Sequence, residues 1–187
     1  MATCLCLQTS FANAESFSQQ LVKAAQERTT HNVKYDGAYQ AIEYPMGDVP
    51  LSQGVCTDLI VRAYRTLDVD LQQLVHEDMR ANFSKYPNHW GLRSTDTNID
   101  HRRVPNLQIF FSRYGNELKI SRDANDYRAG DLVTWVLPGN LPHIGIVSSQ
   151  RVQDSKRPKI IHNIGSGPVE DDILFKYEMT GHYRYKK

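Results

Sequence analysis

The chain has little cysteine. Three cysteines occur in 187 residues, and Cys4 and Cys6 both lie within the first six. Cys56 is therefore the one cysteine of the remaining chain, which excludes a disulfide framework. Neither a paired C-x-x-C spacing nor an H-E-x-x-H motif is present, so no common zinc motif is found. Cys56 calls for an explanation either as a small packed side chain or as a reactive thiol.

The chain also lacks an excess of one charge and a long apolar run. Lys and Arg number 22 against 21 Asp and Glu, for a formal net charge of +1. This balance gives no electrostatic reason to expect nucleic acid or an anionic membrane as partner. No apolar stretch approaches the roughly 20 residues of a membrane-spanning helix. Internal repeats and low-complexity tracts are absent too, so the length predicts one domain.

Residues 1–14 differ from the rest of the chain. A short apolar patch precedes Ala12-Asn13-Ala14, an A-x-A pattern of the kind that signal peptidase cleaves, but the charged n-region is missing. The segment is either the remnant of an export signal or a disordered N-terminus. We favour the first interpretation, which predicts a periplasmic or secreted protein. Residues 15–187 are then expected to form a single catalytic domain.

Four helices are predicted in the first two thirds of the chain. Ser16 and Gln19 form a capping box ahead of an apolar stripe. Pro50 and Gly54 disfavour a helix before Cys56, so a second helix is predicted to begin at or near Cys56. Asp70 is predicted to cap a third. Long polar loops connect them. The predicted helices cover residues 16–29, 56–67, 71–83 and 104–114.

The last third changes character. Short runs rich in β-branched and aromatic residues are separated by turn residues, which predicts strands. Helices first and an antiparallel meander afterwards, without βαβ alternation, indicate an α+β fold with helices mainly N-terminal and strands C-terminal. The predicted strands cover residues 131–137, 143–149, 159–165 and 181–186.

Cys56 lies where the first turn of a helix leaves N–H groups unpaired, which favours a thiolate. Taken alone, however, its position on the apolar helix face favours packing. A thiol nucleophile needs a base and a group to orient that base. Of seven histidines, His143 and His162 alone occur in predicted core strands, whereas His31, His89 and His182 are expected at the surface. A hairpin loop over 149–156 would place His143 opposite His162, with Cβ atoms about 5 Å apart.

The order "GVCTD", "AGDLVTW", "HIGIV" and "IIHNIG" resembles the NlpC-type branch of the papain-like cysteine peptidases. In that branch a Cys-bearing helix packs on an antiparallel sheet. With "HEDM" and "NIDHRRVPN" added, residues 35–185 resemble more closely a bacterial exported family known as a domain of unknown function. The chain departs from the NlpC pattern in having Thr-Asp after the cysteine, where Ser-Gly is usual, and in inserting the "HEDM" and "NIDHRR" segments.

Carried over by position, the resemblance implies that Cys56 is the nucleophile, His143 the general base and His162 the orienting group. The Cys56 N–H would form part of an oxyanion hole. NlpC-type enzymes often add a tyrosine hydroxyl from the segment before the helix. Tyr44 is the predicted donor, with Tyr35 and Tyr39 as alternatives, and Asp58 is expected to support the site.

Further polar residues are predicted to bind substrate. The adjacent arginines suit bidentate binding of substrate carboxylates; the alternative is a solvated run of charges. No metal and no cofactor are expected. The substrate-binding candidates are Tyr35, Asp100, His101, Arg102, Arg103 and Asn163.

The leading prediction is a monomeric, cysteine-dependent amide hydrolase that cleaves peptidoglycan stem peptides, as endopeptidase or amidase, through a thioester acyl-enzyme. Three alternatives remain open. The same triad could serve an acyltransferase, or an amidase on a substrate outside the cell wall. Cys56, His143, His162 and an aspartate could instead hold zinc. The domain could also be a non-catalytic module that binds the cell wall.

Overall fold

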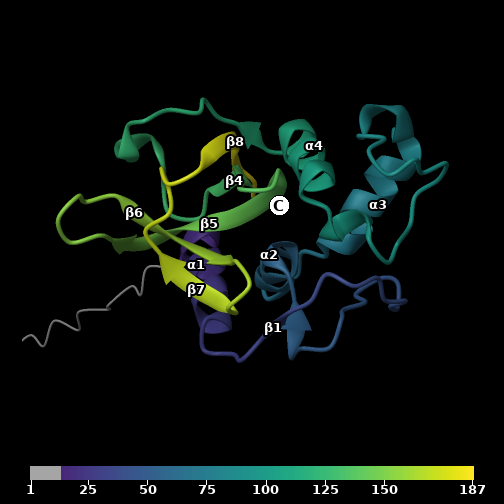
Figure 1. Ribbon diagram of the computed structural model, residues 1–187, viewed down its shortest axis with the longest axis horizontal. Helices are drawn as coiled ribbons and strands as arrows, with labels where there is room; N and C mark the ends of the chain where they lie inside the picture. The colour runs from purple at the N-terminus through teal and green to yellow at the C-terminus, as the bar shows by residue number, and fades with distance from the viewer. Residues whose placement is uncertain (1–13) are drawn as a thin grey trace, which may run out of the picture.

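A computed structural model describes residues 14–187 (Figure 1). The export signal predicted for the N-terminus lies, apart from Ala14, outside these residues and stays a prediction. Within the described range, no helix has both the length and the apolar character needed to cross a membrane.

Helices occupy the N-terminal part, as the sequence predicts. The capping box before the first helix is confirmed: the Gln19 N–H donates to Ser16 Oγ at 3.3 Å, and the Ser16 N–H donates to Gln19 Oε1 at 2.8 Å. Asp70 caps the third helix through the Gln72 N–H, at 3.1 Å. The helices are α1 (Phe17–Arg28), α2 (Cys56–Arg65), α3 (Leu71–Ala81) and α4 (Val104–Tyr114), with short 3₁₀ turns η1 (Phe83–Lys85), η2 (Asp100–Arg102) and η3 (Ala124–Asp126).

The C-terminal part forms one antiparallel sheet of six strands, in the order β3-β8-β4-β5-β6-β7. The sequence analysis missed β3 and β7, which are short edge strands. The strands are β3 (Asn116–Glu117), β4 (Leu132–Leu137), β5 (Leu141–Arg151), β6 (Pro158–Asn163), β7 (Pro168–Asp171) and β8 (Glu178–Arg184); β1 (Lys34–Tyr35) and β2 (Gln53–Gly54) form a separate parallel pair.

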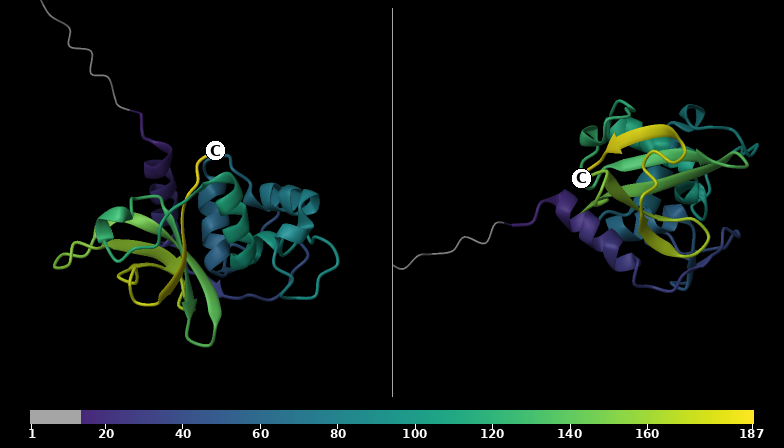
Figure 2. Two further views of the ribbon diagram at one scale, coloured as in Figure 1. Left: turned by 90° about the horizontal axis from the view of Figure 1, so that it is seen from above. Right: turned by 60° about the vertical axis from the view of Figure 1, so that its left-hand side comes forward.

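The two faces of the sheet bury different cores. Because side chains alternate along a strand, Ile144 and Ile146 of β5 pack with helices α1, α2 and α4, whereas Val147 packs with Trp135 on the other face. Helices α2, α3 and α4 gather on one side of the sheet, with α3 farthest from it (Figures 1 and 2). The α+β class is therefore confirmed, with the Cys-bearing helix packed on an antiparallel sheet.

The register of β5 against β6 differs from the predicted hairpin. Strand β5 continues to Arg151, which pairs with Pro158, and Val147 pairs with Ile160. His143 is thus not directly opposite His162, as predicted. The nearest β5 residue to His162 is instead Gly145, where a Cβ would lie 3.2 Å from the Cβ of His162. The shift is two residues, so both histidines keep the same face of the sheet.

The expectation that His182 is a surface residue is wrong. Its side chain is buried, and Nε2 lies 2.9 Å from Asp131 Oδ2. The Tyr127 ring stacks on the imidazole at a centroid distance of 4.3 Å. A histidine in a terminal, polar stretch can still be buried when a charged partner from the neighbouring strand satisfies it.

Candidate active site

Cys56 is the first residue of α2 and is only 3% exposed. The helix begins there because Val55 is extended and its N–H is bound by the Asp58 side chain, at 2.6 Å to Oδ2. Asp58 thus satisfies one of the backbone donors that a helix start leaves free. Its support of the site is to fix the helix start on which the thiol is mounted.

The Cys56 thiol lies next to β5, beyond the point where the pairing of β5 with β6 ends. Val147 directs its N–H and C=O toward the β4 side, bonding the Asp131 carbonyl and the Gly130 N–H. Since these groups alternate along an antiparallel strand, Ile144 directs its own toward β6. The pairing of β5 with β6 ends at Ile146 in this direction. The Ile144 N–H is therefore free of the sheet, and it lies close enough to the Cys56 thiol to lower its pKa.

Burial dominates the acidity of this thiol. It raises the pKa of Cys56 to about 11, while hydrogen bonds from the backbone N–H groups of Ile144, Thr57 and Cys56 itself act in the opposite direction. The helix start therefore stabilises a thiolate, as the sequence predicts, but less than desolvation disfavours it. The resting group at neutral pH is a thiol.

His143 and His162 lie together on the opposite face of β5 and β6 from the helices. Their ring centroids are 5.3 Å apart and the rings are perpendicular, at 89°. Trp135 packs against the other side of His143, with centroids 5.9 Å apart. Burial lowers the pKa of His143 to about 3, and the neighbouring His162 lowers it further; burial also lowers the pKa of His162 to about 4. Both imidazoles are neutral at pH 7.

His143 follows Pro142 and precedes Ile144, and both of these residues lie at Cys56: Pro142 shares a cavity with it, and the Ile144 N–H lies close enough to the thiol to lower its pKa. The structure thus brings Cys56 to the backbone segment that carries His143, but the imidazole itself points to the other face of the sheet, toward Trp135 and His162. Nε2 of His143 and both ring nitrogens of His162 are buried without a hydrogen-bond partner among residues 14–187. The orienting role of His162 stays a prediction.

The tyrosine beside the thiol is Tyr35, not Tyr44. The Tyr35 hydroxyl lies beside the Cys56 side chain, and burial raises the pKa of Tyr35 to about 12. Tyr44 instead packs on His76, with ring centroids 5.1 Å apart, and Tyr39 donates to Asp96 at 3.1 Å. The parallel pairing of β1 with β2 explains the choice, because it places Tyr35 opposite Gly54, two residues before Cys56.

Arg102 does not have the role that the sequence suggested. Its guanidinium is buried and binds Asp58 in a bidentate pair, with Nε at 2.8 Å from Oδ1 and Nη2 at 3.0 Å from Oδ2. It also donates to the carbonyls of Asp36 and Ala38, one and three residues after Tyr35. Arg102 therefore joins the start of α2 to the segment that carries Tyr35, and its donors are not free for a substrate carboxylate.

Three other substrate-binding candidates lie outside the cavity at Cys56. Asp100 is buried and accepts from the Asp96 N–H at 2.6 Å, and burial raises its pKa to about 6. His101 is buried near the cations of Arg65 and Arg102. Asn163 donates to the Gly54 carbonyl at 3.3 Å, which ties the end of β6 to the residues before Cys56.

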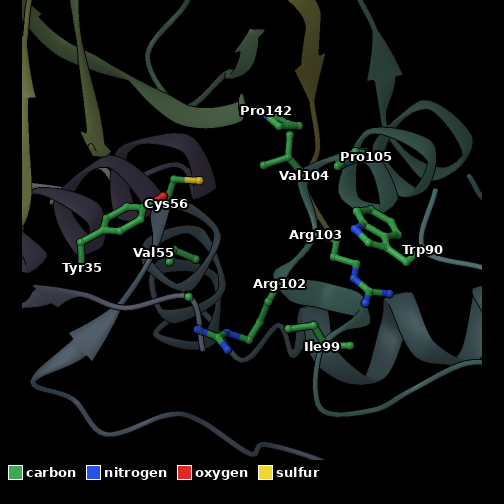
Figure 3. Close-up of a pocket in the computed structure, with 11 residues that line it drawn as sticks. Tyr35, Val55, Cys56, Trp90, Ile99, Arg102, Arg103, Val104, Pro105 and Pro142 are labelled. Atoms are coloured by element: carbon green, nitrogen blue, oxygen red, sulfur yellow. The ribbon is translucent and has the colours of Figure 1, made fainter. Parts of the chain in front are cut away.

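The cavity at Cys56 has a volume of about 260 Å³. Cys56 and Tyr35 form one side of it, and Arg103 with Trp90 forms the opposite side (Figure 3). Within residues 14–187, no group of three or more His, Cys, Asp and Glu side chains is arranged to hold a metal ion. The zinc alternative thus has no ligand set in the described part of the chain.

The neutral histidines give a prediction for stability. An unfolded histidine titrates near 6.5, and burial lowers the pKa values of His101, His143 and His162 to about 3, 3 and 4. Below pH 6.5 the unfolded chain binds more protons than the folded one, so stability falls as pH falls. Asp100, with a pKa raised to about 6, acts in the opposite direction. We expect the free energy of unfolding to fall by about 3 kcal/mol from pH 7.5 to 5.5.

Urea unfolding across this pH range checks the prediction. The variant His101→Leu is the matched control, because it removes one titrating group outside the cavity and should reduce the slope by roughly two fifths. A free energy of unfolding that is constant between pH 7.5 and 5.5 would contradict the assignment of neutral buried histidines.

Comparison with known proteins gives one family and one relative by sequence. The model of the family described as "Domain of unknown function (DUF1287)" matches residues 22–185. The uncharacterized protein YijF of Escherichia coli K12 is 49% identical over 165 residues, which cover 88% of this chain and 80% of that protein.

Solved structures show the same fold at low sequence identity. NlpC1 from Trichomonas vaginalis superposes with a TM-score of 0.50 at 14% identity over 96% of this chain, which spans about half (49%) of that protein. An N-acetylmuramoyl-L-alanine amidase from Bacteroides uniformis gives a TM-score of 0.50 at 14% identity, covering 91% of this chain and 99% of its own. The papain-like, NlpC-type fold implied by the sequence resemblance is confirmed.

Proposed function

The chain belongs to the DUF1287 family and has a papain-like, NlpC-type fold, and on that premise we propose that it is a cysteine-dependent amide hydrolase acting on cell-wall peptides. The observation that carries the proposal is the placement of the Cys56 thiol. It lies at the start of a helix, faces a cavity, and is close to the free N–H of Ile144, the residue that follows His143 in the chain.

The chemistry follows from these parts. The proposed reaction requires the His143 imidazole, which in the structure packs on Trp135 and His162 on the other face of β5, to turn toward the thiol. As the Cys56 sulfur then attacks the amide carbonyl carbon, His143 takes the thiol proton, and the carbonyl oxygen acquires the negative charge. Collapse of this intermediate breaks the C–N bond, and the imidazolium returns the proton to the leaving amine. Water, deprotonated by the same imidazole, then cleaves the thioester and releases the carboxylic acid and the thiol.

Two donors are placed to stabilise the negative oxygen. The Cys56 N–H lies in the first turn of α2, where the helix leaves donors unpaired and the helix dipole favours negative charge. The Tyr35 hydroxyl, already at the thiol, supplies a second donor from β1. In this role Tyr35 takes the place that the sequence analysis gave to Tyr44.

The lowered pKa of His143 keeps its imidazole unprotonated at neutral pH but also makes it a weak base in the resting structure. A general base works in its unprotonated form, and this form persists well below pH 7 because burial lowers the pKa to about 3. In the resting structure the thiol and the imidazole are both neutral and lie on opposite faces of β5. Proton transfer accompanies the attack, and the two opposite charges that result stabilise each other.

The substrate class rests on the fold relatives and the predicted export signal. One structure with this fold is an N-acetylmuramoyl-L-alanine amidase. Together with the A-x-A pattern at Ala12–Ala14, this supports a periplasmic or secreted hydrolase of peptidoglycan.

Digestion of purified peptidoglycan tests the function. We expect the wild-type protein to release fragments whose masses correspond to hydrolysis of an amide bond, and Cys56→Ala to release none. The absence of new products from the wild type would refute the proposed substrate. Equal release by Cys56→Ala would refute a cysteine mechanism.

A further inference from the structure

Arg103 lies across the cavity from the proposed nucleophile and is not paired like its neighbour. Its guanidinium stacks on the Trp90 ring, 4.1 Å from the ring centroid. Nη1 is buried and has no hydrogen-bond partner among the described residues. The nearest carboxylate oxygen in an ion pair with it, Asp100 Oδ1, is 3.9 Å away and is itself without a hydrogen bond.

Such an arrangement is costly in an empty site. Buried charged groups normally make hydrogen bonds, and an unpaired buried donor loses its hydration without compensation. The preceding residue, Arg102, shows the usual outcome, because its guanidinium is hydrogen-bonded to the Asp58 carboxylate. Stacking on Trp90 holds the Arg103 guanidinium in place by its face. Because Nη1 is buried, the donors that a ligand can reach are those of Nε and Nη2, which make no hydrogen bond within residues 14–187.

The rest of the cavity narrows the choice of ligand. Among the residues that line it in the described part of the chain, none is acidic, and the walls between Cys56 and Arg103 include Val104, Pro105 and Pro142. Figure 3 shows Cys56 with Tyr35 on one side and Arg103 with Trp90 on the other. A ligand that fills this space meets a nucleophile at one end, apolar walls between, and one guanidinium without a hydrogen-bonded carboxylate at the other.

We propose that Arg103, supported by Trp90, forms a subsite for a carboxylate of the substrate peptide, one that lies beside the amide bond attacked by Cys56. The proposal deepens the proposed function and rests on it. A carboxylate matches the planar fork of a guanidinium, and the Nε and Nη2 donors of Arg103, which are not buried, can bind it in a bidentate pair. Asp100 balances the charge of Arg103 at a distance when the subsite is empty.

Binding to a protein that cannot turn over the substrate tests this subsite separately from catalysis. The probes are the stem tetrapeptide L-Ala-γ-D-Glu-meso-diaminopimelate-D-Ala and a set of forms in which each carboxylate in turn is a carboxamide. Affinities are measured by calorimetry with Cys56→Ala as the parent protein. We expect one of the amidations to weaken binding about 10- to 100-fold, the range for a charge-assisted hydrogen bond.

Adding Arg103→Gln to the parent should remove this preference, so that the tetrapeptide and its amidated forms bind about equally. Arg103→Lys, which keeps the charge but not the fork, should retain part of it. Arg122→Gln is the matched control, because Arg122 is also stacked on an aromatic ring, Phe175, but does not line the cavity. It should leave all affinities unchanged.

The proposal is overturned if no amidation weakens binding more than about twofold, if Arg103→Gln weakens all peptides equally, or if none of the peptides binds. Turnover of the same peptides by the wild type is measured in parallel. Arg103-dependent binding without turnover would refute the proposed hydrolase and leave the subsite standing. Turnover without discrimination between carboxylate and carboxamide would refute the subsite alone.

Discussion

Replacing Cys56 by alanine is expected to lower kcat/KM for amide hydrolysis at least about 10⁴-fold, because no other group in the cavity can form the covalent intermediate. The Ile144 N–H and the hydroxyl of Tyr35 lie next to the thiol, and neither group can act as a nucleophile in its place. Steady-state hydrolysis of a soluble stem peptide measures the effect.

The same substitution should cost little stability. It removes one buried sulfur at the edge of the core between α2 and the sheet, for which we expect a loss of about 1 kcal/mol in the free energy of unfolding. A large loss of stability together with the loss of activity would mean that Cys56 acts by packing. Activity within tenfold of the wild type would remove the nucleophile from this site.

Replacing Arg102 by methionine is expected to lower the free energy of unfolding by about 3–5 kcal/mol, the usual effect of breaking a buried ion pair. The side chain of Asp58 is 3% exposed, and without Arg102 its carboxylate would keep only the Val55 N–H as partner. The carbonyls of Asp36 and Ala38 would lose donors as well. Urea unfolding of both proteins measures the difference.

The double variant Arg102→Met with Asp58→Asn separates the charge from the packing. Neutralising Asp58 removes the unpaired charge while its amide oxygen can still accept from the Val55 N–H, so the double variant should recover part of the lost stability. A change below about 1 kcal/mol for Arg102→Met alone would show that the pair is not effectively buried.

The elements of this fold could be predicted because local patterns determine them. The capping box at Ser16, the Asp70 cap and the β-branched runs of β4, β5 and β6 each encode an element within a few residues. The approach of the His143 segment to Cys56 was implied by the family resemblance, which summarises long-range contacts that local patterns do not contain.

The rest depended on long-range pairing. Strand pairing determines which tyrosine lies at the thiol. Because β1 pairs with β2, Tyr35 lies next to Cys56, whereas Tyr44 packs on His76 of α3. The predicted hairpin register was wrong because β5 continues to Arg151 before the turn begins. The polar residues around this position do not indicate where the strand ends. Arg102 and Arg103 look alike in sequence, and only the position of Asp58 shows that one is occupied while the other is open.

The central claim is that the thiol of Cys56 acts as a nucleophile in the folded protein, assisted by His143. Labelling the native protein with a stem peptide that carries a chloromethyl ketone, followed by peptide mass mapping, tests it most directly. We predict a single adduct on Cys56 that forms at neutral pH and that His143→Ala slows at least about 100-fold, as expected for loss of the base. An adduct that forms only after unfolding, or at the same rate without His143, would contradict the account.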